Sequence, residues 1–383
     1  MKVLLHIGQS KTGTSAIQAY LTLNRARLAE QGILYPTVKV GGLPVDIGNH
    51  NAVADALMGL SRFPYFPADR YFKEFFAEAE RINAQLLILS AEHFFGGEPR
   101  IWDVPSESAY FTLYRKKLDT LSRYLFDLDT TVLVYLRPQI DWLESAISQT
   151  IRISGLISRK QLYQNDEQFF QMIKPLLKYN FLLSAWSEIL NPRQIIAIPY
   201  ERNNLRNNST IDDFLARAGL NGLDFPYGTV SLEVNSSLTR EYVEVKKILN
   251  RTKRSKVSER VIIECLQKLS NTGKFSRTYQ ISTGLSGQVS EFVSDENAEI
   301  NRRFVAEGMA LSAASKARTA IDRPTDQDIL QAMQRFDKEY QSISGRTMLI
   351  DHALRAFLRE HAGPVHSMLH QIKRYQRRIL YKT

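Results

Sequence analysis

The first residues of the chain combine a short apolar run, a loop with two glycines and the start of a helix. Residues 2–7 read Lys-Val-Leu-Leu-His-Ile, a run typical of a strand buried on both faces. Residues 14–31 follow with apolar positions at helical spacing and stop at Gly32. A strand that passes directly into a helix opens a βαβ unit, so we expect a parallel sheet.

The same alternation of strands and helices continues to about residue 235. Further strands are predicted at 85–89, 130–136 and 194–198, and helices at 51–60, 68–83, 109–126, 140–151, 181–190 and 211–218. Beyond residue 236 we predict a helix over 240–250, a basic loop or helix start over 251–260 and a loop over 273–288. We therefore predict an α/β fold: a P-loop-type parallel sheet flanked by helices over 1–235, and a mainly helical C-terminal extension over 236–383.

The net charge of +10 favours anionic partners, and half of it lies in residues 351–383, with seven Lys or Arg and two Asp or Glu. This basic tail reads either as a solvated helix face or as a contact with a membrane surface or a polyanion. Cys265 is the single cysteine, which excludes an intramolecular disulfide and fits a reducing compartment. Without a signal-peptide core or a long apolar run, the chain is expected to be cytoplasmic.

The loop after the first predicted strand has the composition of a phosphate cradle. Backbone N–H groups and the helix dipole there favour an anion, Gly13 permits close approach, and Lys11 adds a mobile positive charge. In the ordinary nucleotide-triphosphate loop, G-x-x-x-x-G-K-[ST], the lysine follows the second glycine, whereas here Lys11 precedes Gly13. The alternative to a phosphate-binding loop is a tight turn with a solvated lysine. The residues expected to bind phosphate are Gly8, Ser10, Lys11, Thr12, Gly13, Thr14 and Ser15.

A second anion anchor is predicted after the strand over 130–136. Arg137 follows that strand directly, and Ser145 lies eight residues further along the next predicted helix. A guanidinium and a hydroxyl that converge in this way can clamp a phosphate. The alternative is an arginine that caps the edge of its own sheet.

These motifs resemble those of the PAPS-dependent sulfotransferases. Lys-Thr-Gly-Thr-Ser at 11–15 is similar to their 5'-phosphosulfate loop, and His-Ile-Gly-x-x-Lys-Thr-Gly-Thr resembles a bacterial branch associated with glycan sulfation. Arg137 and Ser145 match the 3'-phosphate motif, and Tyr200 matches a tyrosine that often contacts adenine. The resemblance implies transfer of a sulfuryl group from 3'-phosphoadenosine-5'-phosphosulfate (PAPS) to an acceptor hydroxyl, with a glycan as the expected acceptor and with no metal.

The resemblance also suggests a catalytic base. Glu92 follows the strand over 85–89, where cytosolic members carry a catalytic histidine and several glycan sulfotransferases use glutamate. His93 is adjacent, and His50 lies in a loop where bacterial relatives often carry a histidine, so His50 stays open as an alternative base. His6 is expected to be buried beneath the loop.

Two other classes of function remain open from the sequence alone. A P-loop small-molecule kinase would use a similar cradle, although no acidic Mg²⁺ ligand follows a predicted strand. A non-enzymatic anion-binding protein would account for the positive charge. Nucleic acid is not an expected partner, no metal-binding motif is visible, and the sequence does not identify the acceptor.

Overall fold

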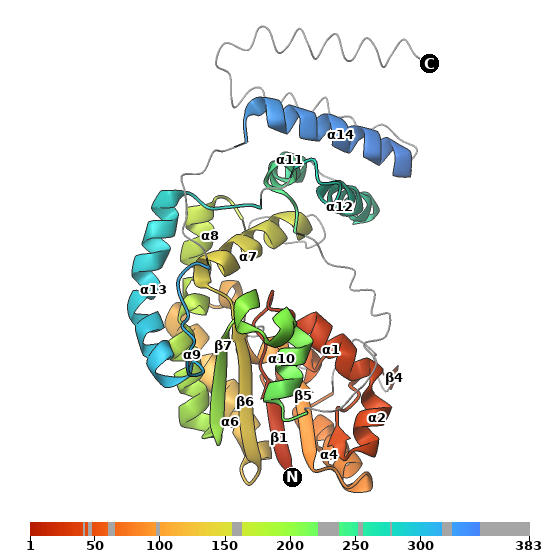
Figure 1. Ribbon diagram of the computed structural model, residues 1–383, viewed down its shortest axis with the longest axis vertical. Coiled ribbons are helices and arrows are strands. Elements are labelled where there is room, and N and C mark those ends of the chain that lie inside the picture. Colours follow the sequence, from red (N-terminus) through yellow and green to blue (C-terminus); the bar gives the residue numbers. More distant parts are fainter. Residues whose placement is uncertain are drawn as a thin grey trace. The chain divides into compact units, whose positions relative to one another are not determined.

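The structure, a computed structural model (Figure 1), describes residues 1–40, 43–44, 48–59, 66–96, 100–154, 163–220, 237–251, 256–275, 278–315 and 324–344. The chain forms two compact units. The first comprises Met1–Ala146, Gln164–Val234 and Ile281–Ala320, and the second comprises Ile147–Tyr163, Asn235–Gln280 and Ile321–Thr383. The predicted boundary at 235–236 and the basic tail over 351–383 lie outside the described residues.

A five-stranded parallel sheet forms the centre of the first unit. Its strands run in the order β2-β5-β1-β6-β7. They are β1 (Lys2–His6), β2 (Ile33–Leu34), β5 (Leu86–Ser90), β6 (Asp129–Leu136) and β7 (Gln194–Pro199). The prediction of an α/β fold with a parallel sheet flanked by helices is confirmed. The edge strand β2 was not predicted, because its apolar run is only two residues long and the strand is defined by its pairing with β5.

Helices cover both faces of this sheet. On one face, α1 (Thr14–Leu23), α2 (Arg25–Glu30) and α10 (Thr210–Arg217) share a buried core with alternate residues of the strands, such as Leu4 and Leu133. Leu5 and Val132 point the other way and are also buried, so the second face is covered as well. Figure 1 shows α1 and α10 in front of the sheet. On the other side, α6 (Glu107–Leu125) packs against the π-helical turn Trp186–Leu190, and α9 (Tyr179–Ala185) packs against α13 (Thr283–Arg303).

The direction of the strand connections changes between β1 and β6. The chain leaves β1 toward β2 at one edge of the sheet, and it leaves β6 toward β7 at the other. In open parallel sheets, ligands bind outside the carboxyl ends of the strands at such a switch point. The segments that begin at Ile7 and Arg137 therefore occupy the favoured position for a ligand site.

The remaining elements of the first unit connect these layers. A small antiparallel pair is formed by β3 (Lys39–Val40) and β4 (Leu43–Pro44). The α-helices are α3 (Asn51–Ala56), α4 (Ala68–Arg81), α5 (Glu92–Phe95), α7 (Gln139–Ile153), which continues into the second unit, and α8 (Asp166–Ile173). The 3₁₀ turns are Ile101–Asp103, Lys174–Leu177, Arg202–Asn204 and Arg206–Asn208.

The structure corrects the bounds of several predicted elements; for example, the helix predicted over 51–60 ends at Ala56. The helix predicted over 14–31 is two helices, because Asn24 leaves the helical conformation and donates its side-chain amide back to the Tyr20 carbonyl. The loop predicted over 273–288 ends earlier than expected, because Ser282 caps α13 by accepting a hydrogen bond from the Leu285 N–H. Gly284 and Gly287, which suggested a loop, lie inside this helix.

The described part of the second unit contains α11 (Arg240–Asn250), α12 (Lys256–Ser270) and α14 (Asp326–Ser344), together with the end of α7. α14 packs against both α11 and α12. A buried ion pair between Lys246 and Glu259 joins α11 to α12. Among the described helices of the chain, none combines the length and the apolar character that crossing a membrane requires.

Candidate anion site at the ends of β1 and β6

The loop between β1 and α1 is a tight turn with two left-handed residues. Lys11 has φ 72° and Gly13 has φ 79°, whereas Thr12 between them has a negative φ. Such alternation turns successive backbone N–H groups toward one side, as in known concave anion-binding loops. α1 begins directly after Gly13 without a side-chain cap. The Ala16 N–H donates to the Gly13 carbonyl at 3.0 Å, so it is the N–H groups of Thr14 and Ser15, at the very start of the helix, that could bond a ligand.

Glycine is required at two positions of this loop. A Cβ at Gly8 would lie 2.3 Å from Thr14 Cγ2, and a Cβ at Gly13 would lie 2.9 Å from Thr210 Oγ1 and 3.1 Å from the Tyr200 hydroxyl. The loop therefore packs directly against the start of α10 and the residue that follows β7. Thr12 is buried and donates to the Gln9 carbonyl at 2.6 Å, whereas Ser15 is exposed and Ser10 and Lys11 are half-buried.

Arg137 lies at the same edge of the sheet. Its backbone N–H donates to the side-chain oxygen of Gln9 at 2.7 Å, which joins the end of β6 to the loop after β1. Arg137 is half-buried as a residue, and its guanidinium forms no ion pair with any residue that the structure describes. A partly desolvated cation without a protein counter-ion is suited to an anionic ligand.

Tyr200 and Ser145 complete the predicted anion-binding residues. The Tyr200 N–H donates to the Leu136 carbonyl at 2.7 Å, and its hydroxyl lies beside Gly13, so Tyr200 flanks the loop between β1 and α1. Ser145 is half-buried on α7, two turns after Arg137, and among the described residues its hydroxyl has no hydrogen-bond partner. The structure thus brings Tyr200 to the loop but shows no contact between Ser145 and Arg137.

Glu92 reaches the loop between β1 and α1 from the end of β5. It is the first residue of α5, two residues after the end of β5, and its carboxylate accepts a hydrogen bond from the Thr14 hydroxyl. The side chain is half-buried, so it is held in place without being closed off from solvent. Its neighbour His93 instead pairs with Asp55 at 2.7 Å.

His50 has a different environment. Its Nδ1 accepts from the Ser90 N–H at 3.0 Å, its Nε2 lies 3.1 Å from the Pro36 carbonyl, and only 1% of the residue is exposed. The ring packs edge-on against Tyr35 and Phe75. Both ring nitrogens are occupied by the backbone, so His50 ties the loop before α3 to the end of β5.

The prediction that His6 is buried is confirmed. The residue is fully buried beside Gly8 of the loop between β1 and α1. Its Nδ1 lies 2.8 Å from the Ser90 hydroxyl, which also accepts from Gln18 at 3.2 Å. Ser90 therefore contacts both buried histidines, through its side chain for His6 and through its backbone for His50. This packing supports the loop from below.

Sequence reasoning did not identify Gln9, Tyr179 and Thr210 as parts of this site. Gln9 is buried and bonds to the Tyr179 hydroxyl, and Thr210 packs against Gly13. The one sequence signal that could have identified Gln9 is its place two residues after the predicted strand over 2–7. Tyr179 and Thr210 are distant in sequence, and no pattern linked them to the loop.

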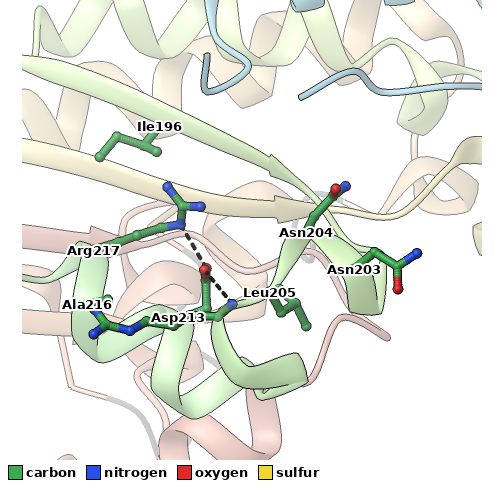
Figure 2. A pocket seen from close by; sticks show the side chains of 8 residues that line it. Ile196, Asn203, Asn204, Leu205, Asp213, Ala216 and Arg217 are labelled. Carbon is green, nitrogen blue, oxygen red and sulfur yellow. Dashed lines mark hydrogen bonds and ion pairs between the residues drawn. The ribbon is translucent and has the colours of Figure 1, made fainter. Parts of the chain in front are cut away.

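A cavity of about 610 Å³ lies elsewhere in the first unit (Figure 2). It contains none of the predicted site residues, and its lining is Ile196, Asn203, Asn204, Leu205, Arg206, Asp213, Ala216 and Arg217. Figure 2 shows Arg217 reaching the Asp213 carboxylate, at 2.8 Å. That carboxylate also accepts from the Tyr135 hydroxyl and the Arg206 N–H, so three donors of the protein already bond it.

Comparisons with models of protein families, with curated protein sequences and with solved structures found no match for this chain. Within the part of the chain that the structure describes, no three His, Cys, Asp or Glu side chains are grouped so that they could hold a metal ion. The interpretation of the site therefore depends on its geometry and on the motifs in the sequence.

The two buried histidines predict a loss of stability in acid. Burial lowers the pKa of His6 to about 3 and that of His50 to about 4, against about 6.5 in an unfolded chain. As the pH falls, the unfolded state takes up these protons first, so the stabilisation is complete above pH 6.5 and is lost below it. Between pH 7 and pH 5 we expect the free energy of unfolding to fall by about 1–2 kcal/mol for each histidine.

Urea denaturation at a series of pH values measures this effect. The variant His50→Gln keeps a donor for the Pro36 carbonyl but does not titrate, so its stability should depend less steeply on pH. Identical pH dependence in the variant and the wild type would contradict a neutral, buried His50.

Proposed function

We propose that this chain is a PAPS-dependent sulfotransferase that moves a sulfuryl group to an acceptor hydroxyl on a carbohydrate or glycoconjugate. The observation that carries the proposal is the hydrogen bond between Gln9 and the Arg137 N–H, which holds a lysine-containing loop and an arginine at neighbouring strand ends. Two cationic anchors at one edge of a parallel sheet suit a nucleotide with two separate phosphate groups.

The residues at the site fit such a nucleotide. The loop at Gly13 has no room for a Cβ, because Thr210 and the Tyr200 hydroxyl lie directly beside it, and the Arg137 guanidinium has no counter-ion among the described residues. Lys11 and the loop N–H groups would hold the 5'-phosphate end, and Arg137 with Ser145 would hold the 3'-phosphate. Tyr200, beside Gly13, would contact the adenine. The resemblance of the loop to the glycan-sulfating branch supports the carbohydrate acceptor.

The chemistry requires a proton acceptor and positive charge beside the leaving group. When bound, PAPS supplies the sulfuryl group and a bisphosphate leaving group. Lys11 stabilises negative charge at the 5'-phosphate end, and Glu92 accepts the proton of the acceptor hydroxyl. The Thr14 hydroxyl orients Glu92 and keeps its carboxylate beside the loop. His50 is a weaker candidate for the base, because both of its ring nitrogens are bonded to the backbone.

The first prediction of this function concerns Arg137. The variant Arg137→Ala should weaken binding of adenosine 3',5'-bisphosphate by about 10–100-fold, because a hydrogen bond to a charged group contributes about 1.5–3 kcal/mol. Binding of adenosine 5'-phosphate should change much less. Isothermal titration calorimetry with both ligands and with ATP measures this, and the exposed Arg202→Ala serves as the control.

Equal weakening of both adenosine nucleotides in Arg137→Ala would show that the residue has only a structural role. Tighter binding of ATP than of adenosine 3',5'-bisphosphate by the wild type would instead favour a small-molecule kinase. Absence of binding to all three ligands would reject a nucleotide site at these strand ends.

The second prediction concerns Lys11. The variant Lys11→Ala should lower turnover by about 10²–10³-fold, because it removes a positive charge beside the leaving group. Alanine is subject to the same backbone cost as lysine at this positive φ, so the loop conformation is not made worse. Transfer from radiolabelled PAPS to a panel of glycan acceptors measures the effect. Lys2→Ala, at the far end of β1, is the control, and full turnover in Lys11→Ala would reject the assignment.

The third prediction concerns the base. The variant Glu92→Gln should lose most turnover in both kcat and kcat/KM while it keeps its fold and nucleotide affinity, because the amide oxygen can still accept from Thr14. The acidic limb of the pH–rate profile should vanish from the residual activity. His50→Gln should remain active at neutral pH. If Glu92→Gln is active and His50→Gln is inactive, His50 is the base.

A further inference from the structure

Gln9 is a buried polar residue of the loop between β1 and α1, and its side chain contacts Arg137, the second of the two proposed anion anchors. Only 3% of the residue is exposed. Its side-chain oxygen accepts from the Arg137 N–H at 2.7 Å, and its side-chain nitrogen donates to the Tyr179 hydroxyl at 2.5 Å. The Tyr179 hydroxyl in turn donates to the Arg137 carbonyl at 3.1 Å. These three bonds form a closed ring.

The ring admits one orientation of the Gln9 amide. If the amide were flipped, its NH₂ group would face the Arg137 N–H, and two donors would oppose each other. Burial raises the pKa of Tyr179 well above its ordinary value, so the hydroxyl keeps the proton that it donates. Each donor and acceptor in the ring is used once, which is the arrangement that a buried polar group requires.

The ring connects the two anion anchors beyond the end of the sheet. The Ile7 N–H donates to the Leu133 carbonyl at 3.0 Å and continues the pairing of β1 with β6 by one residue. Two residues later, the backbones separate and the side chain of Gln9 makes a further connection. Gln9 stands two residues before Lys11 on one side and is bonded to Arg137 on the other.

We propose that Gln9 is a positioning residue that fixes the separation of the two anchors, so that the site selects nucleotides with two separate phosphate groups over those with one. This inference depends on the proposed function and specifies the ligand class of the same site. A ligand that binds both anchors gains from their fixed separation, because the protein has already lost that freedom before binding. A ligand that binds one anchor gains little.

The test compares two glutamines. Gln9→Met keeps the length of the side chain and removes its donor and acceptor, and Gln18→Met makes the same change at another buried glutamine, which bonds Ser90 at 3.2 Å. Calorimetry gives the ratio of the Kd for adenosine 5'-phosphate to the Kd for adenosine 3',5'-bisphosphate. We expect this ratio to fall about ten-fold in Gln9→Met, the equivalent of one lost hydrogen bond, and to stay at the wild-type value in Gln18→Met.

A second variant keeps the proposal testable if Gln9→Met does not fold. Tyr179→Phe removes the hydroxyl and keeps the ring that packs against Phe95. We expect it to lower the same ratio by a smaller factor, because the Gln9 oxygen can still accept from Arg137. Amide hydrogen exchange at Arg137 provides a measurement without ligand, and it should be faster in Gln9→Met than in the wild type or Gln18→Met.

The outcomes separate this inference from the proposed function. If Gln9→Met weakens the binding of both nucleotides equally, or leaves amide hydrogen exchange at Arg137 unchanged, Gln9 has no positioning role. The proposed function still stands in that case if the wild type prefers the bisphosphate. If the wild type does not prefer the bisphosphate, both proposals fail. A lowered ratio together with faster exchange at Arg137 supports the positioning role.

Discussion

Parallel hydrogen bonding between β1 and β6 places the segments that follow the two strands at one edge of the sheet. His6 lies opposite Leu133 in this register, so the loop after β1 and the residue after β6 emerge side by side. β5 and β7 flank the pair and bring Glu92 and Tyr200 to the same edge. Every residue of the candidate site that follows a strand depends on this pairing, because the four strands are far apart in sequence.

A buried layer of hydrogen-bonded histidines lies beneath the loop between β1 and α1. Ser90, at the end of β5, bonds His6 through its hydroxyl and His50 through its backbone, and aromatic rings pack around both histidines. Burial keeps both rings neutral at physiological pH, so they contribute packing and hydrogen bonds and no charge. The positive charge of the site comes from Lys11 and Arg137, which stand above this layer.

The sequence predicted the long strands and the residues that follow them. β1, β5 and β6 have continuous apolar runs, and residues after a parallel strand share one edge, so Lys11, Glu92 and Arg137 could be expected there. Other features depend on contacts that no local pattern records. Gln9 meets Tyr179 across 170 residues, and His50 appears in the sequence as an ordinary loop residue. Its burial is decided by Tyr35 and Phe75, which come from different segments.

The left-handed backbone of Lys11 has a consequence for protein engineering. A non-glycine residue at φ 72° raises the free energy of the folded state, typically by about 1–3 kcal/mol, and glycine would relieve this cost. A selection for thermal stability alone would therefore favour glycine at position 11, although it would remove the cation of the loop. Stability and the proposed ligand binding thus make opposite demands on one residue. Stabilised versions of this protein should be sought in its helices and in the second unit, with residues 8–15 left unchanged.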